Sequence, residues 1–173
     1  GLVILAVPLD QVQDALKAVA QDLRPDVVVM DMAPVKETVM TWAKELLPAH
    51  THYIGLVPVI NPSYLQTHEG GTEAAHADLF QNGLMAIVSG RGTPSEAIKL
   101  ASDLSQLLGA EHLFIDPVEL DSMMSATHLL PQLMAAALLN TTVDQPGWRE
   151  ARMLTGRAFA EAAGPAVLFD QNA

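Results

Sequence analysis

Cysteine is absent from the 173 residues of this sequence, so disulfide bonds and thiolate chemistry are excluded. Lysine and arginine are scarce: nine of them stand against 20 aspartates and glutamates, which gives a formal net charge of −11. Binding to nucleic acid or to an anionic membrane surface needs clustered basic side chains, so this balance argues against both partners. The partners that we expect are small molecules and other copies of the chain.

Long hydrophobic runs are also lacking. The two longest, GLVILAVPL and LMAAALL, are much shorter than the roughly 20 apolar residues that span a bilayer. The first run has neither the basic flank nor the small-residue cleavage site of a signal peptide. We therefore expect a soluble, cytoplasmic protein. Because the chain opens inside a strand-like run at Leu2, we also expect that upstream residues belong to the fold.

The histidines do not suggest a metal site. None forms a helical pair around a carboxylate, as H-E-x-x-H does. Five of them are spread over different predicted segments of the chain: His50, His52, His68, His76 and His112. We therefore expect no bound metal.

The first part of the chain alternates between strand-like and helix-like patterns. Apolar runs of strand length occur at 2–7, 26–31, 52–59, 84–90 and 111–116. Apolar residues at helical spacing occur between them, at 10–23, 36–47 and 93–110, with a shorter helix expected over 73–82. Continuous apolar strands separated by helices are typical of a parallel sheet covered on both faces. We therefore predict an α/β domain over residues 1–116, with a partial Rossmann-type parallel sheet and flanking helices.

From Pro117 onward the pattern becomes all helical, and we assign 117–173 to a separate helical segment. One long helix is predicted over 117–142, with a kink at Pro131. After Leu129 this helix is apolar nearly all round, which favours burial between partners. A second helix is predicted over 147–164. The segment is therefore expected to form a homodimer through the helix 117–142.

Six short motifs follow one another in an order that resembles a known family. They are VILAVPLDQV, DMAPVK, IGLVPV, HADLFQN, the stretch from Leu108 to Leu138, and WREARM. In this order they resemble the prephenate and arogenate dehydrogenases, NAD(P)-dependent enzymes of tyrosine biosynthesis. That family combines a Rossmann domain with a helical dimerisation domain, so the resemblance implies the same fold and a small-molecule substrate here.

The resemblance also implies candidate site residues. Val7 and Pro8 would line the cofactor side of the first loop, and Asp31 and Lys36 would flank the turn after the second strand. A plainer interpretation is that Asp31 caps the turn while Lys36 is a solvated helix residue.

Two further residues match family positions that contact the substrate. His128 matches a histidine that touches the substrate, and Arg152 matches an arginine that pairs with a substrate carboxylate. The plainer interpretations are a core or interface histidine and a surface arginine.

Three departures from the family pattern bear on catalysis. The family's catalytic histidine, which takes the substrate hydroxyl proton, is replaced by Val57, so the catalytic residue here is unknown. A serine and a second histidine of the family are replaced by Pro34 and Leu120. None of these three side chains can act as a general acid or base.

No G-x-G-x-x-G turn occurs in the sequence either, although a Rossmann fold uses one to hold the dinucleotide pyrophosphate. We therefore expect this chain to bind NAD or NADP weakly or not at all. Two functional hypotheses remain open. The first is an oxidoreductase that transfers hydride from a cyclohexadienol such as prephenate to NAD(P). The second is a catalytically silent dimeric homologue that acts as a binding or scaffold protein.

Overall fold

The computed structural model describes residues 1–65 and 71–167. Contacts within the chain divide it into two compact units, Gly1–Asp121 and Ser122–Ala173.

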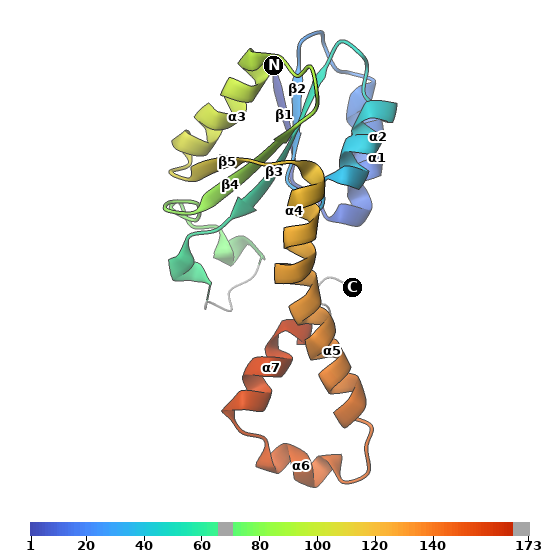
Figure 1. Cartoon of the computed structure of the whole chain (residues 1–173), viewed down its shortest axis with the longest axis vertical. Helices are drawn as coiled ribbons and strands as arrows, with labels where there is room; N and C mark the ends of the chain where they lie inside the picture. The colour runs from blue at the N-terminus through green and yellow to red at the C-terminus, as the bar shows by residue number, and fades with distance from the viewer. Residues whose placement is uncertain (66–70, 168–173) are drawn as a thin grey trace. The chain divides into compact units, whose positions relative to one another are not determined.

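The first unit contains a five-stranded sheet with the order β1-β2-β3-β4-β5 (Figure 1). The strands are β1 (Leu2–Leu5), β2 (Val28–Asp31), β3 (His52–Val59), β4 (Leu84–Ser89) and β5 (Glu111–Phe114). Helices α1 (Leu9–Ala20) and α2 (Glu37–Leu46) lie on one side of the sheet, and α3 (Ser95–Leu107) lies on the other. The prediction of an α/β fold with a Rossmann-type sheet and flanking helices is confirmed.

Each face of the sheet carries its own hydrophobic cluster. Toward α1 and α2 the cluster includes Val29, Val12, Leu16 and Val39, all of them buried. Toward α3 the buried side chains alternate along the strands, as a pleated sheet requires; they are Val28, Met30, Ile54, Leu56, Met85 and Ile87. The continuous apolar runs in the sequence therefore reflect strands that are covered on both faces.

The sheet is mixed, however: the expected parallel arrangement holds for three of the four strand pairs and not for β3 and β4. Strands β1, β2 and β3 are parallel, β3 and β4 are antiparallel, and β4 and β5 are again parallel. The cause is the connection between β3 and β4. Its described parts contain two short 3-10 helices, Pro62–Tyr64 and Gly71–Ala74, in place of the helix expected over 73–82. Without a crossover helix, the chain turns back beside β3 in the opposite direction.

The long helix expected over 117–142 is present, with an irregular turn in its middle. It consists of α4 (Pro117–Met124), a π-helical turn (Ser125–Leu129) and α5 (Leu130–Thr142). Pro131 has no N–H to donate to the carbonyl of the preceding turn, so the helix adopts a wider turn directly before it. The irregularity that Pro131 indicated therefore takes the form of a π turn.

The single helix expected over 147–164 is wrong, because two helices occupy this stretch. They are α6 (Trp148–Leu154) and α7 (Arg157–Val167). Thr155 is extended, with φ −64° and ψ 128°, and Gly156 follows it with a low intrinsic preference for helix. Helix α7 packs against α5, and the rings of Trp148 and Phe159 lie 5.7 Å apart between centroids.

Candidate functional site

The candidate site lies where the parallel strands β2 and β3 run side by side. Asp31, the last residue of β2, is in register with Gly55 of β3. Alternate side chains of a strand share a face, so Tyr53, Gly55 and Val57 all lie on the face of the sheet that carries Asp31. Val57, where the family has its catalytic histidine, is therefore the next position on that face after Gly55.

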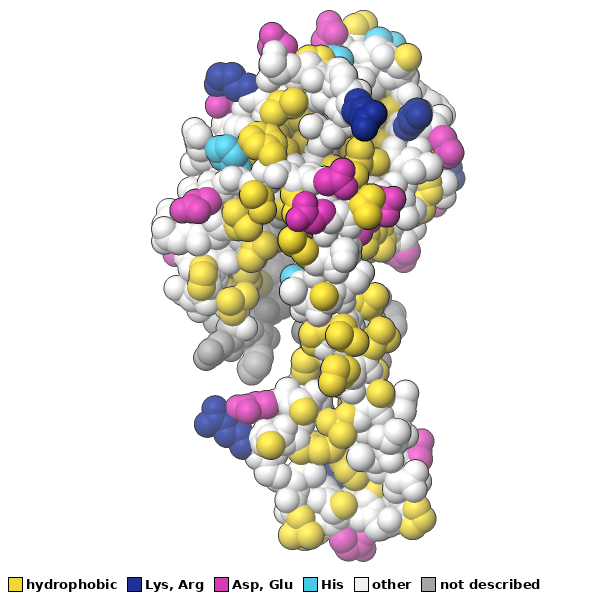
Figure 2. Space-filling view, in the orientation of Figure 1, with side chains coloured by type: hydrophobic (Ala, Val, Ile, Leu, Met, Phe, Trp, Pro, Cys, Tyr) yellow, Lys and Arg dark blue, Asp and Glu magenta, His cyan; other side chains and the backbone are white. Residues whose placement is uncertain are grey.

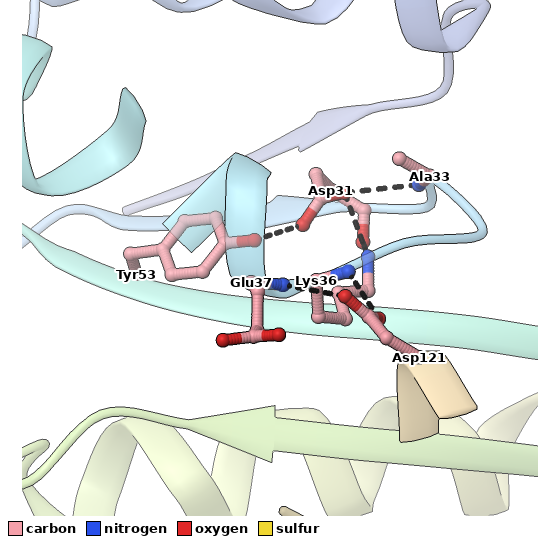
Figure 3. A network of polar contacts seen from close by, with 6 residues as sticks. All are labelled: Asp31, Ala33, Lys36, Glu37, Tyr53 and Asp121. Carbon is pink, nitrogen blue, oxygen red and sulfur yellow. Dashed lines mark hydrogen bonds and ion pairs between the residues drawn. The ribbon is translucent and has the colours of Figure 1, made fainter. Parts of the chain in front are cut away.

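A buried ion pair between Lys36 and Asp31 forms the centre of this region (Figure 3). The Lys36 Nζ atom lies 2.7 Å from Asp31 Oδ1, and both residues have an exposed fraction of 0%. The Asp31 Oδ1 atom also accepts a hydrogen bond of 2.9 Å from the Ala33 N–H. The second carboxylate oxygen, Oδ2, accepts a hydrogen bond from the Tyr53 hydroxyl. Both oxygens of Asp31 are therefore satisfied, as a buried charge requires.

Gly55 provides the space that Lys36 occupies. A Cβ atom at this position would lie only 2.6 Å from Lys36 Cδ and 3.0 Å from Cε. The aliphatic stem of Lys36 therefore lies directly on the backbone of β3. Any larger residue at position 55 would displace Lys36 from Asp31.

Asp121 of α4 binds the turn between β2 and α2 through two backbone amides. Its Oδ1 atom accepts a hydrogen bond of 2.6 Å from the Lys36 N–H, and its Oδ2 atom accepts one of 2.9 Å from the Glu37 N–H. These two amides at the start of α2 have no acceptor within the helix, and no side chain of α2 caps them. A carboxylate at a helix N-terminus satisfies such donors and interacts favourably with the helix dipole. Asp121 thus fixes where α2 begins.

Burial controls the ionisation of the two groups that face Asp31. It lowers the pKa of Lys36, and the neighbouring charge of Asp31 opposes this shift. Burial, followed by the charge and hydrogen bond of Asp31, raises the pKa of the Tyr53 hydroxyl. The Tyr53 hydroxyl therefore stays protonated and donates a hydrogen bond to Asp31.

The plainer interpretation of this turn is right for Asp31 and wrong for Lys36. Asp31 does cap the turn, because it accepts the Ala33 N–H. Lys36 is not a solvated helix residue but one of the largest fully buried side chains in the described chain.

The remaining candidates of the first unit are apolar. Val7 is half-buried against the α1 and α2 cluster, and Pro8 is exposed directly before α1. Pro34 is exposed in the turn that Lys36 closes. Val57 and Leu120, which replace the two family histidines, are packed in the interior, with exposed fractions of 4% and 5%.

His128 and Arg152 belong to the second unit, and both side chains are exposed. The Nδ1 atom of His128 lies 2.9 Å from the hydroxyl oxygen of its neighbour Thr127. Among the described residues, no hydrogen bond or ion pair joins His128 to Arg152. The structure thus brings together Asp31, Lys36 and the Val57 position. The side chains of His128 and Arg152 are exposed to solvent.

Tyr53, Gly55 and Asp121 were not among the site residues predicted from the sequence. Tyr53 and Gly55 were visible as a polar residue and a glycine inside the apolar run 52–59, and Asp121 stands beside the Leu120 substitution. A glycine inside a strand often marks the close approach of another group, and this was the available signal.

A search of residues 1–65 and 71–167 finds no group of three or more His, Asp and Glu side chains that could hold a metal ion. In the same residues, no helix is long and apolar enough to cross a membrane.

The sheet, its two helical layers and the turn at the ends of β1 and β2 define an α/β domain of the Rossmann class. The particular family follows from the sequence: residues 1–113 match the family described as prephenate dehydrogenase, nucleotide-binding domain. The chain therefore belongs to the prephenate dehydrogenase family, and the resemblance found in its motifs is confirmed.

Two curated relatives and one solved structure illustrate the match. Prephenate dehydrogenase of Bacillus subtilis is 26% identical over 141 residues, which cover 81% of this chain and 37% of the relative. Cyclohexadienyl dehydrogenase of Zymomonas mobilis is 28% identical over 140 residues, which cover 80% of this chain and 45% of the relative. The chain therefore spans less than half the length of these relatives.

The structural match extends beyond the matched domain. Prephenate dehydrogenase from Aquifex aeolicus, solved in complex with hydroxyphenyl propionate and NAD+, has a TM-score of 0.72 to this chain at 17% identity. The match covers 99% of this chain and 65% of that one. At this level of identity the likeness establishes the fold.

Replacement of Lys36 tests whether the buried ion pair is the centre of the first unit. Lys36→Met leaves the Asp31 carboxylate buried without its cation, so we expect it to lower the free energy of unfolding by about 3–5 kcal/mol. The double variant Lys36→Met/Asp31→Asn removes both charges, and we expect a loss smaller than the sum of the two single losses. Urea denaturation followed by Trp42 fluorescence in a Trp148→Phe background measures each value within the first unit.

Lys99→Met is the matched control, because Lys99 forms an exposed ion pair with Asp103 at 2.6 Å. We expect this variant to change stability by less than about 1 kcal/mol. Equal losses in Lys36→Met and Lys99→Met would contradict the central role of the Lys36 pair.

Stability at alkaline pH depends on Tyr53. An unfolded tyrosine releases its proton near pH 10, whereas the raised pKa of Tyr53 keeps the folded hydroxyl protonated above that pH. The folded state then binds more protons than the unfolded state, so stability falls as the pH rises above about 10, by up to about 1.4 kcal/mol per pH unit. Tyr53→Phe removes this contribution, so its stability should fall less steeply above pH 10. Parallel curves for the two proteins would show that Tyr53 titrates normally.

Proposed function

We propose that this chain forms part of an NAD(P)-dependent oxidoreductase of tyrosine biosynthesis. In the proposed reaction, a hydride passes from the ring of a cyclohexadienol such as prephenate to the cofactor, carbon dioxide leaves, and the ring becomes aromatic. The observation that carries this proposal is the family match over residues 1–113, with the motifs in family order. Arogenate is the alternative substrate.

The residues around the first loop fit the uncharged part of a dinucleotide. Ala6, Pro8 and Pro34 are exposed there and apolar, and Val7 is half-buried beside them. The only cation of the neighbouring turn, Lys36, is buried against Asp31 and cannot reach a phosphate. We therefore assign cofactor contact to Val7 and Pro8, while Asp31 and Lys36 hold the turn in place. NAD or NADP, when bound, supplies the hydride acceptor.

The substrate would be held by the second unit. Arg152 is exposed and has a planar guanidinium group, which matches a carboxylate with two parallel hydrogen bonds. His128 is exposed one turn before Pro131, and its imidazole nitrogens can hydrogen-bond to a substrate. Because Val57 cannot accept a proton, the acid–base step requires a group other than the residue at that position.

A second candidate function is that of a catalytically silent dimeric homologue, which binds a ligand or a partner without turnover. One observation favours it. Both family histidine positions, Val57 and Leu120, carry apolar side chains that are packed into the interior. The polar groups of the reaction have thus been replaced by contributions to the hydrophobic core.

Calorimetric titration with NAD and NADP, each with and without prephenate, separates the two functions. If the chain is part of the oxidoreductase, we expect weak cofactor binding that prephenate strengthens, because hydride transfer requires both ligands to be bound at the same time. Arg152→Ala should weaken prephenate binding about tenfold or more by removing a charged hydrogen-bond pair. Arg149→Ala, an exposed arginine on the same helix, is the matched control and should have no effect.

Heat changes that are absent from every combination at millimolar ligand would contradict the assignment of cofactor and substrate contacts to this chain and favour the silent homologue. Binding of NAD(P) and prephenate without any product in a turnover assay would favour the silent homologue as well.

The helix 117–142 also supports the proposal of a homodimer. It exposes large apolar side chains over one stretch: Leu129, Leu130, Leu133 and Met134. Figure 2 shows hydrophobic side chains gathered along this helix. Soluble proteins rarely leave such a stretch exposed to water, and an interface between two copies would cover it.

Introduction of a charge into this stretch tests the dimer. Leu133 is 54% exposed, so Leu133→Glu should leave the folded unit intact while placing a carboxylate in the proposed interface. We expect light scattering coupled to size exclusion to change from a dimer of 18.5 kDa chains to a monomer. Leu107→Glu is the control, because Leu107 is 83% exposed on α3, which belongs to the first unit. A wild-type monomer, or a dimer that survives Leu133→Glu, would contradict the proposed interface.

A further inference from the structure

A cavity of about 650 Å³ lies at the amino end of β3, away from the Val57 position. It is bordered by α2, by the start of β3 and by the loop between β4 and α3. Its volume falls within the range of small-molecule sites, roughly 300–1,000 Å³. Neither the candidate cofactor residues nor the candidate substrate residues line it.

Two of the nine lysines and arginines of the chain border this cavity. Lys44 reaches it from α2 and Arg91 from the loop before α3, and no carboxylate lines it. Neither cation has an ion-pair partner among the described residues, so both charges are available to a ligand. In a chain with a net charge of −11, two unpaired cations at one concave site favour an anionic ligand.

The remaining wall is mostly apolar. Met40, Ala43 and Leu47 of the α2 segment and the ring of Tyr53 line it. The hydroxyls of Thr51 and Thr93 are engaged in donating to the backbone carbonyls of Pro48 and Gly90, so they are not free to donate to a ligand. The apolar part of a ligand could therefore pack against this wall. Lys44 and Arg91 are the groups that would select a ligand with a negative charge.

We propose that this cavity is a second ligand site, which takes a small organic anion. The anionic group, a phosphate or a carboxylate, lies between Lys44 and Arg91, and the apolar body lies against Met40 and Leu47. The site does not depend on the oxidoreductase proposal, because it shares none of the residues assigned to that reaction. It does contact Tyr53, whose hydroxyl holds Asp31, so an occupant touches the network beside the Val57 position.

Three probes separate the two parts of the recognition. Phenyl phosphate carries both the ring and the charge, inorganic phosphate carries the charge alone, and benzyl alcohol carries the ring alone. In ¹H–¹⁵N spectra of the labelled protein, we expect phenyl phosphate to give saturable shifts of the amides that line the cavity. We expect its dissociation constant to be at least about fivefold lower than that of either other probe, because both contacts contribute.

Variants test the assignment of the charge. Lys44→Gln and Arg91→Gln should each raise the dissociation constant of phenyl phosphate about fivefold or more, by removing one charged contact. Arg149→Gln, with the same loss of one charge at an exposed site in the second unit, should leave it unchanged. Spectra of the free variants that match the wild type outside the substituted position confirm that each variant is folded.

Three results would overturn the proposal. The first is the absence of saturable shifts at up to about 10 mM phenyl phosphate, a concentration that corresponds to less than about 3 kcal/mol of binding. The second is an equal effect of Lys44→Gln, Arg91→Gln and Arg149→Gln. The third is displacement of phenyl phosphate from the cavity by NAD, which would make the cavity part of a dinucleotide site.

Discussion

The ion pair between Lys36 and Asp31 is the constraint on which the first unit depends. Two charges are removed from water, and their attraction compensates only if every remaining polar atom is satisfied. Two hydrogen bonds satisfy the Asp31 carboxylate, one from the Ala33 N–H in the turn and one from the Tyr53 hydroxyl on β3. Gly55 leaves the space that the Lys36 side chain occupies. Removal of either hydrogen bond would leave the buried Asp31 carboxylate with one partner fewer, and a side chain at position 55 would displace Lys36.

The ion pair also determines the structure around Val57, the position at which the family has its catalytic histidine. Lys36 lies on β3 at Gly55, so the next position on that face, Val57, is held in a fixed place relative to the turn after β2. Asp121 then fixes the start of α2 through the Lys36 and Glu37 amides. Position 57 therefore lies in a fixed place beside this turn, while its side chain is apolar. Both proposed functions follow from this combination.

The local pattern of apolar residues was sufficient to predict most of the strands and helices. The five strands and the helices α1, α2 and α3 were predicted from apolar periodicity, because each buries a continuous face. The direction of β4 could not be predicted, since it depends on how the loop after β3 folds. The break at Thr155 and Gly156 was missed because the apolar spacing continues across it.

The site was less accessible to sequence reasoning, because its contacts are long-range. A lysine at the start of an amphipathic helix is usually solvated, and nothing near Lys36 in the sequence indicates that Gly55 leaves room for it. The Asp121 cap joins residues that are 85 positions apart in the chain. The family resemblance pointed to Asp31 and Lys36, and the structure supplied the physical reason for their pairing.

The environment of the Lys36 amine is the most direct test of this account. Side-chain ¹H–¹⁵N spectra at neutral pH distinguish a buried, hydrogen-bonded lysine from lysines whose protons exchange rapidly with water. We predict one slowly exchanging signal, which belongs to Lys36 and disappears in Asp31→Asn. A Lys36 amine that exchanges as fast as those of Lys17 and Lys99 would contradict the central place of the ion pair.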